Sequence, residues 1–173
     1  MWPPGEAFVV VATLLYSGIF LAGLIGNSFI IITVLRWKEM KTPCNLLVMN
    51  IAIADLAVAV IAAPLRILEI HYHWPFGDFM CKFLAPLQDV FVCVSVVTHT
   101  TIALERYRAI VKSMMNKISV SVTKAVICVS WFGCYFTAAL PIAIISRTEE
   151  QNSQVFCTIS FPSTTFQIGR AHV

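Results

Sequence analysis

The sequence predicts an all-α membrane protein with four transmembrane helices. Of its 173 residues, 58% are hydrophobic and 12% are charged, whereas about a quarter of the residues in a soluble domain are charged. The few charges leave four stretches of more than twenty residues that each hold at most one charge. Each stretch is long enough to cross the ~30 Å hydrocarbon core of a bilayer. Because backbone in lipid must satisfy its own hydrogen bonds, we expect helices despite the many Val and Ile residues.

Charged and turn-forming residues at the ends of these stretches set the expected boundaries. The helices are expected at residues 7–35, 43–70, 78–111 and 121–146. The expected outer segments are the N-terminus at residues 1–6, a first outer loop at 71–77 and a second outer loop, leading toward a fifth helix, at 147–167. The inner loops are expected at residues 36–42 and 112–120. Pro43 suits the first turn of a helix, and Pro75 with Gly77 marks the outer loop as a turn.

The last six residues, 168–173, read Ile-Gly-Arg-Ala-His-Val. This hexapeptide is the translation of ATCGGAAGAGCACACGTC, a short-read sequencing adapter. We therefore expect an artefactual end, with the natural reading frame diverging at about Gln167. The alternative is an ordinary loop end, and resequencing the transcript distinguishes the two.

Basic residues near the short loops predict the orientation. They gather after the first helix and around the loop between the third and fourth: Arg36, Lys38, Lys41, Arg106, Arg108, Lys112, Lys117 and Lys124. Because cytoplasmic loops carry an excess of Lys and Arg, the N-terminus is expected outside the cell. No basic flank precedes the first stretch, which indicates a helix and not a signal peptide. The net charge of +3 reflects the inner loops, so we expect no nucleic-acid partner.

Two of the six cysteines fall on the outer side. These are Cys81 at the start of the third helix and Cys157 in the second outer loop; the others lie in apolar stretches or on the reducing inner side. Disulfides form in oxidising compartments, so the sequence predicts a Cys81–Cys157 bond. Two free thiols are the alternative.

Asp55 is a carboxylate near the middle of the second apolar stretch. A charge at this depth costs about 3 kcal/mol on insertion scales, so it should face the bundle interior and polar partners. Asn27 in the first helix and Ser95 in the third lie at similar depth. The group is either a sodium site or a purely structural set of hydrogen bonds.

Asn50 precedes Asp55 by five residues and therefore projects about 140° away around the helix, toward a different neighbour. Trp131, well inside the fourth helix, carries an indole N–H that needs an acceptor in lipid. We expect an interhelical hydrogen bond between them, with a structural role.

The third helix has a partly polar side, on which Cys81, Gln88 and Ser95 recur at seven-residue spacing. Gln88 and Asp89 lie about two turns from its outer end, where they either meet a ligand or, in the case of Gln88, bridge helices. At its inner end stands Glu105-Arg106-Tyr107, a tripeptide that by itself indicates only a solvated pair of charges.

Several motifs occur in order along the helices. They are Gly26-Asn27, Met40-Lys41-Thr42-Pro43, Asn50 to Leu56 (N-x-A-x-A-D-L), Pro64, Trp74-Pro75-Phe76-Gly77 with Cys81, Glu105-Arg106-Tyr107, and Trp131 with Pro141. With these motifs the chain resembles the rhodopsin-like (class A) G-protein-coupled receptors over residues 15–160, and neuropeptide-type receptors most of all. The resemblance implies a plasma-membrane, multi-pass protein holding four helices of a seven-helix bundle.

The resemblance gives roles to the polar residues inside the membrane. Asp55, Asn27 and Ser95 would form an allosteric sodium pocket, and sodium is the only cofactor we expect. His99 stands where the family usually has an aliphatic residue, just below this pocket, and a titratable group there would make ion occupancy depend on pH.

At the inner side the resemblance implies coupling to a heterotrimeric G protein. Within the tripeptide Glu105-Arg106-Tyr107, Glu105 would hold Arg106 at rest, and activation would release the arginine to the G protein. Met114 would insert into a hydrophobic pocket of that partner. The family usually has Pro where this chain has Ser113, a change expected to loosen the loop.

The resemblance also limits the class of ligand. Receptors for biogenic amines carry an Asp seven residues after the disulfide cysteine of the third helix, where this chain has Gln88, so an amine is disfavoured. We expect an extracellular peptide, and Asp89 with Glu149 and Glu150 would favour a basic one.

Two other classes of protein compete with a receptor. A four-helix transporter would place Asp55 on an ion path. An enzyme would need a metal site, for which His71, His73 and Cys81 are candidates; no further ligands stand at suitable spacing, and we expect no enzymatic activity.

Overall fold

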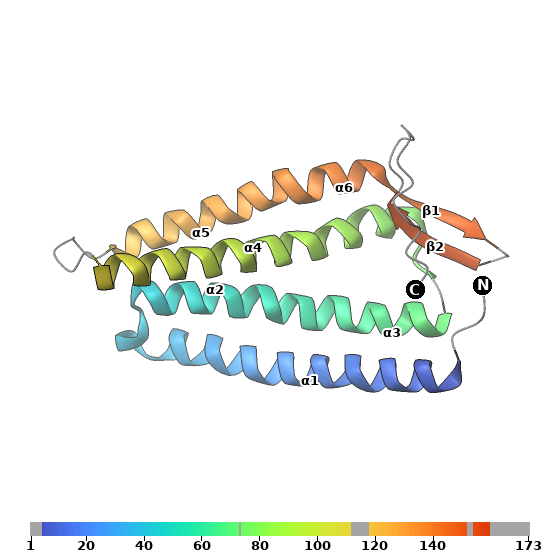
Figure 1. Cartoon of the computed structure of the whole chain (residues 1–173), viewed down its shortest axis with the longest axis horizontal. Helices are drawn as coiled ribbons and strands as arrows, with labels where there is room; N and C mark the ends of the chain where they lie inside the picture. The colour runs from blue at the N-terminus through green and yellow to red at the C-terminus, as the bar shows by residue number, and fades with distance from the viewer. Residues whose placement is uncertain (1–4, 73, 112–117, 152–153, 160–173) are drawn as a thin grey trace.

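A computed structural model describes residues 5–72, 74–111, 118–151 and 154–159 (Figure 1). Four long helical segments lie side by side in it, and the second and fourth are each built of three consecutive pieces. The segments are α1 (Glu6–Arg36); α2 (Pro43–Ala57), η2 (Val58–Ala62) and α3 (Ala63–Tyr72); α4 (Gly77–Val111); and α5 (Val120–Cys134), η3 (Tyr135–Ala139) and α6 (Leu140–Ile145). All four are long and apolar enough to cross a membrane, with mean hydropathies of 1.6 to 2.4. The predicted fold class is confirmed.

The helix starts follow from capping residues. Thr42 Oγ1 accepts a hydrogen bond from the Asn45 amide at 3.3 Å, and Pro43 occupies the first turn of α2. Ser119 Oγ accepts from the Val122 amide at 3.3 Å and caps α5 in the same way. Such side chains satisfy amides that lack a partner within the helix. They explain why the second helix begins at the expected residue and the fourth one residue earlier than expected.

Two π turns, η2 and η3, interrupt helices that were expected to be regular. Each widens the helix by one residue, and η2 begins three residues after Asp55. Ala59 in η2 is 3% exposed and lies against Gly23 of α1. Side-chain periodicity did not predict these turns, because they add a single residue to a segment that is apolar all round.

A β-hairpin lies at one end of the bundle, which we call the hairpin end (Figure 1). Strands β1 (Ser146–Gln151) and β2 (Gln154–Ile159) pair antiparallel, with Thr148 opposite Cys157. The sequence predicted a loop at residues 147–167 and a helix through Ser146, so the strands were not expected and the helix ends one residue earlier. The loop before α4 contacts the hairpin through a backbone hydrogen bond from the Trp74 amide to the Val155 carbonyl at 2.9 Å.

The core lies along α4, which packs against α2 on one side and against α5, η3 and α6 on the other. A cluster of buried residues marks it: Ala54, Val90, Phe91, Val94, Cys134 and Ala139. Helix α1, by contrast, buries Val34 alone and exposes large apolar side chains such as Phe29, which is 71% exposed. Such a surface suits lipid.

Candidate functional site

Asp55 and Ser95 meet between α2 and α4. Ser95 Oγ donates a hydrogen bond to Asp55 Oδ1 at 3.1 Å, and the Asp55 side chain is half-buried. Carboxylate and hydroxyl oxygens are the ligand types that a hard cation prefers. Asn27 Nδ2 instead donates to the Gly23 carbonyl of its own helix at 2.9 Å, and within the described residues no hydrogen bond joins Asn27 to Asp55. Two of the three predicted sodium ligands are therefore in contact.

Asn50 joins three helical segments. Trp131 Nε1 donates to Asn50 Oδ1 at 2.9 Å, which confirms the predicted pair. Asn50 Nδ2 donates in turn to Thr98 Oγ1 at 2.9 Å, and Thr98 donates to the Val94 carbonyl at 2.6 Å. Thr98 was not predicted as a member of this group. It stands three residues after Ser95, so helical spacing to a polar neighbour was the available signal.

His99, expected below the ion site, has a ring Nδ1 that lies 2.7 Å from the Ser95 carbonyl. The contact is local to α4, and the His99 side chain is exposed.

Gln88 and Asp89 lie on α4 in the half nearer the hairpin. Gln88 is half-buried and Asp89 is exposed, and neither forms a hydrogen bond with any described residue. Arg66 of α3 forms an ion pair with Glu69 at 2.7 Å. In the described part of the chain, then, Gln88 does not bridge helices, and both side chains have unused polar groups.

Three contacts order the hairpin end. The predicted disulfide is confirmed: Cys81 and Cys157 are bonded, with their Cα atoms 5.5 Å apart. Asp78 Oδ1 accepts the Thr148 amide at 3.0 Å, while its other oxygen pairs with Lys82. Trp74, which is 6% exposed, donates from Nε1 to the Gly77 carbonyl at 2.8 Å.

Gly77 makes this turn with φ +71°, a backbone conformation that glycine adopts without strain.

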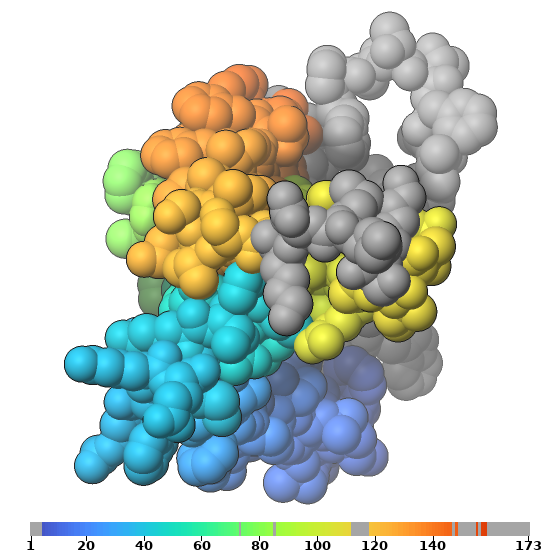
Figure 2. All heavy atoms as spheres, turned by 90° about the vertical axis from the view of Figure 1, so that its left-hand side faces the viewer, coloured from blue at the N-terminus to red at the C-terminus, as the bar shows by residue number. Residues whose placement is uncertain are grey.

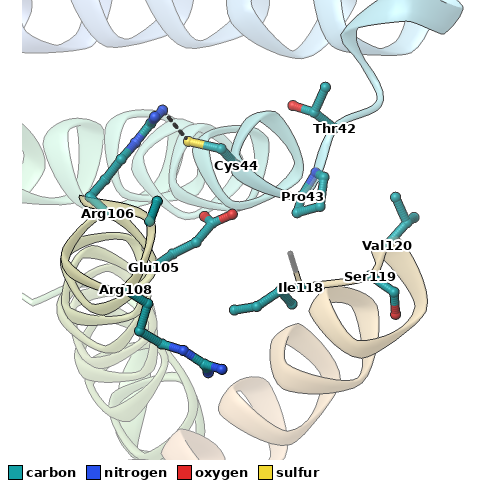
Figure 3. A pocket seen from close by; sticks show the side chains of 10 residues that line it. Thr42, Pro43, Cys44, Glu105, Arg106, Arg108, Ile118, Ser119 and Val120 are labelled. Carbon is teal, nitrogen blue, oxygen red and sulfur yellow. Dashed lines mark hydrogen bonds between the residues drawn. The ribbon is translucent and has the colours of Figure 1, made fainter. Parts of the chain in front are cut away.

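At the opposite end, which we call the Arg106 end, the termini of α1, α2, α4 and α5 come together (Figure 2). A cavity of about 460 Å³ opens there between the start of α2, the end of α4 and the start of α5. Pro43, Cys44, Glu105, Arg106, Ile118 and Ser119 are among its lining residues (Figure 3).

The expected contact between Glu105 and Arg106 is not formed in this structure. Arg106 Nη2 donates to Cys44 Sγ at 2.9 Å, and Glu105 Oε2 is buried without a hydrogen-bond partner among the residues that the structure describes (Figure 3). Successive residues of a helix project about 100° apart, which turns these two side chains in different directions. Tyr107 is 57% exposed. Met114 lies outside the described residues, as do residues 168–173.

The comparison with known families decides the class of protein. Residues 26–172 match the family described as "7 transmembrane receptor (rhodopsin family)". The chain belongs to this family. The resemblance inferred from the motifs is thereby confirmed, and the four helices are part of the seven-helix receptor bundle.

Several curated members of the rhodopsin family are similar to this chain. The type-1 angiotensin II receptor B of Xenopus laevis is 36% identical over 155 residues, 87% of this chain and 42% of that receptor. The QRFP-like peptide receptor of Branchiostoma floridae is 32% identical over 143 residues, 81% and 37% of the two chains. The neuropeptide Y receptor type 2 of Homo sapiens is 37% identical over 136 residues, 78% and 35%. The chain spans about two fifths of the length of these relatives.

Membership in a receptor family also bears on the competing classes. It does not support a four-helix transporter. For the zinc enzyme, Cys81 is engaged in the disulfide, and His71 Nε2 lies 3.1 Å from Thr13 Oγ1. His73 lies outside the described residues. No group of three or more potential metal-binding His, Cys, Asp or Glu side chains occurs within the part of the chain that the structure describes.

Proposed function

We propose that this chain supplies the first four helices of a plasma-membrane receptor that binds an extracellular peptide and activates heterotrimeric G proteins. The hairpin end faces outward and the Arg106 end faces the cytoplasm. This orientation is supported by the basic residues that flank the loops at the Arg106 end and by the disulfide at the hairpin end, which belongs in an oxidising compartment.

The observation that carries the ligand proposal is the state of Gln88 and Asp89. Both are accessible on α4, below the disulfide-tethered hairpin, with no hydrogen bond to a described residue. An amide and a carboxylate with unused groups suit the polar backbone and basic side chains of a peptide. The peptide receptors among the relatives support the same ligand class.

Binding tests this proposal. We expect a radiolabelled basic peptide to bind cells that express the full-length reading frame, and Asp89→Asn to weaken that binding at least tenfold, since the variant removes the charge with little change in shape. Glu6→Gln, which removes an exposed carboxylate at the start of α1, outside the proposed contact, is the control. Unchanged affinity in Asp89→Asn would contradict a charge-based peptide site.

The signalling half of the proposal assigns Arg106 to the G-protein contact, with Met114 of the neighbouring loop as an apolar anchor. Arg106 is exposed and lines the cavity at the cytoplasmic end. We expect Arg106→Ala to abolish ligand-stimulated nucleotide exchange on purified G proteins while ligand binding is retained. Arg36→Ala removes another exposed arginine at the same end and is expected to signal normally. Full activation by Arg106→Ala would refute this role.

We propose in addition that Asp55 and Ser95 bind a sodium ion that modulates the receptor, with Asn27 as a third candidate ligand. The donor set supports it: Ser95 Oγ and Asp55 Oδ1 lie 3.1 Å apart, and the Asn27 amide uses only its NH₂ group within α1, which leaves its carbonyl oxygen as a further ligand. When bound, the ion would neutralise a carboxylate that is otherwise costly at this depth.

A further inference from the structure

Arg106 is held by a residue of another helix and not by its acidic neighbour. Its guanidinium Nη2 donates to the thiol of Cys44 at 2.9 Å (Figure 3). We infer that Cys44 is a positioning residue that keeps Arg106 against α2 in the inactive receptor, so that removing the thiol raises signalling without ligand. The inference rests on the proposed role of Arg106 in G-protein coupling and adds the contact that restrains it.

Cys44 is a fixed point on α2. It is the second residue of the helix, directly after Pro43, and the Thr42 cap fixes the backbone of this turn. Leu46 and Leu47, in the next half-turn, are 7% and 3% exposed and anchor the turn in the bundle. Because the first turn of α2 is held by backbone and packing, the thiol cannot follow Arg106 when the arginine moves.

Arg106 is the mobile partner of the pair. It lies five residues before the end of α4, and its side chain is exposed. A long side chain of this kind keeps several rotamers near the helix end. One hydrogen bond to a neighbouring helix therefore selects the rotamer that lies against α2, and the guanidinium must leave Cys44 before it can reach a G protein.

Glu105 does not take over this restraint in the structure. Its carboxylate lines the cavity, and its buried Oε2 has no hydrogen-bond partner within the described part of the chain (Figure 3). A carboxylate would hold a guanidinium by a strong, charge-assisted bond, whereas a thiol is a weak, uncharged acceptor. Little free energy is therefore needed to release Arg106 from Cys44. We expect the equilibrium between restrained and released arginine to respond to small changes at residue 44.

The test is ligand-free signalling by variants of Cys44 in the full-length receptor. Cys44→Val has nearly the shape of cysteine and no acceptor, whereas Cys44→Ser keeps an acceptor. We expect Cys44→Val to raise ligand-free GTPγS binding by purified G proteins about two- to fivefold per surface receptor, the effect of losing one weak hydrogen bond. Cys44→Ser should stay at or below the wild-type rate. A packing defect alone would not be rescued by the smaller serine.

Cys128→Val is the matched control, because Cys128 is an exposed free cysteine of α5 that does not line the cavity; it should leave the rate unchanged. If Cys44→Val fails to reach the surface, Cys44→Ala tests the same loss of acceptor with less bulk. Wild-type ligand-free rates in the valine and alanine variants that do reach the surface, or equal rises in valine and serine, would overturn the inference. Failure of the proposed function has a different signature, namely normal activation by Arg106→Ala.

Discussion

Trp131 Nε1 lies 2.9 Å from Asn50 Oδ1 and donates a hydrogen bond to it across 81 residues of sequence. The amide of Asn50, 3% exposed, also donates to Thr98 Oγ1, so one side chain fixes α2, α4 and α5 relative to one another. The hydrophobic effect does not favour one apolar contact over another in lipid, and directional bonds of this kind therefore contribute to helix register.

Replacing Asn50 should loosen the bundle. We expect Asn50→Ala to lower the free energy of unfolding by about 1 to 3 kcal/mol, since two interhelical bonds are lost. Denaturation of the purified receptor in detergent, followed by circular dichroism, measures the change. Trp131→Phe removes only one bond and keeps an aromatic ring near Phe91, whose centroid is 6.0 Å from that of Trp131; its effect should be smaller. Strictly additive effects in the double variant would contradict the bond.

Gly23 permits the close approach of α1 to η2. A Cβ at Gly23 would lie 2.5 Å from the Cβ of Ala59, closer than two carbon atoms tolerate, so the backbones must separate. We expect Gly23→Ala to destabilise the receptor by about 1 to 3 kcal/mol. At Gly18 an added Cβ meets no described atom within 4 Å, and Gly18→Ala should be neutral or slightly stabilising through helix propensity. Equal thermal stability of the two variants would show that α1 does not pack as described.

Asp55 should make peptide binding depend on sodium. In membranes from cells expressing the full-length receptor, we expect sodium chloride to lower the affinity for a radiolabelled agonist several-fold relative to potassium chloride at the same ionic strength, which keeps screening constant. Asp55→Asn should lose this dependence and retain surface expression, and Ser95→Ala should weaken it. Sodium dependence that survives in Asp55→Asn would leave Asp55 with a structural role only.

Asp78 should hold the hairpin in addition to the disulfide. Its Oδ1 accepts the Thr148 amide at 3.0 Å and lies 3.4 Å from the Thr148 hydroxyl. We expect Asp78→Ala to increase hydrogen exchange at the Thr148 amide several-fold, because that amide loses its acceptor. Thr148→Val keeps the hydrogen bond from the backbone amide of residue 148 to Asp78, so this amide should exchange nearly as slowly as in the wild type. Slow exchange in Asp78→Ala would mean that the disulfide and Trp74 hold the hairpin without Asp78.

The sequence predicted much of the site because membrane burial is restrictive. Asp55, Ser95, Asn50 and Trp131 were each identifiable as polar groups that needed a partner in lipid, and few side chains at similar depth could form a hydrogen bond with them. Two of these pairs are in contact in the structure. Asn27 is the exception, since its amide bonds to its own helix, an option that composition and depth do not exclude.

What the sequence alone determined is the number of crossings, the cysteines that pair and the polar residues that need partners, because these depend on apolar length, compartment and depth. Only the tertiary structure decided that Arg106 contacts Cys44, that Glu105 Oε2 has no hydrogen-bond partner among the described residues, and that strands β1 and β2 pair against α4. These outcomes depend on how neighbouring helices are rotated and spaced. That geometry is set by packing between segments far apart in the chain.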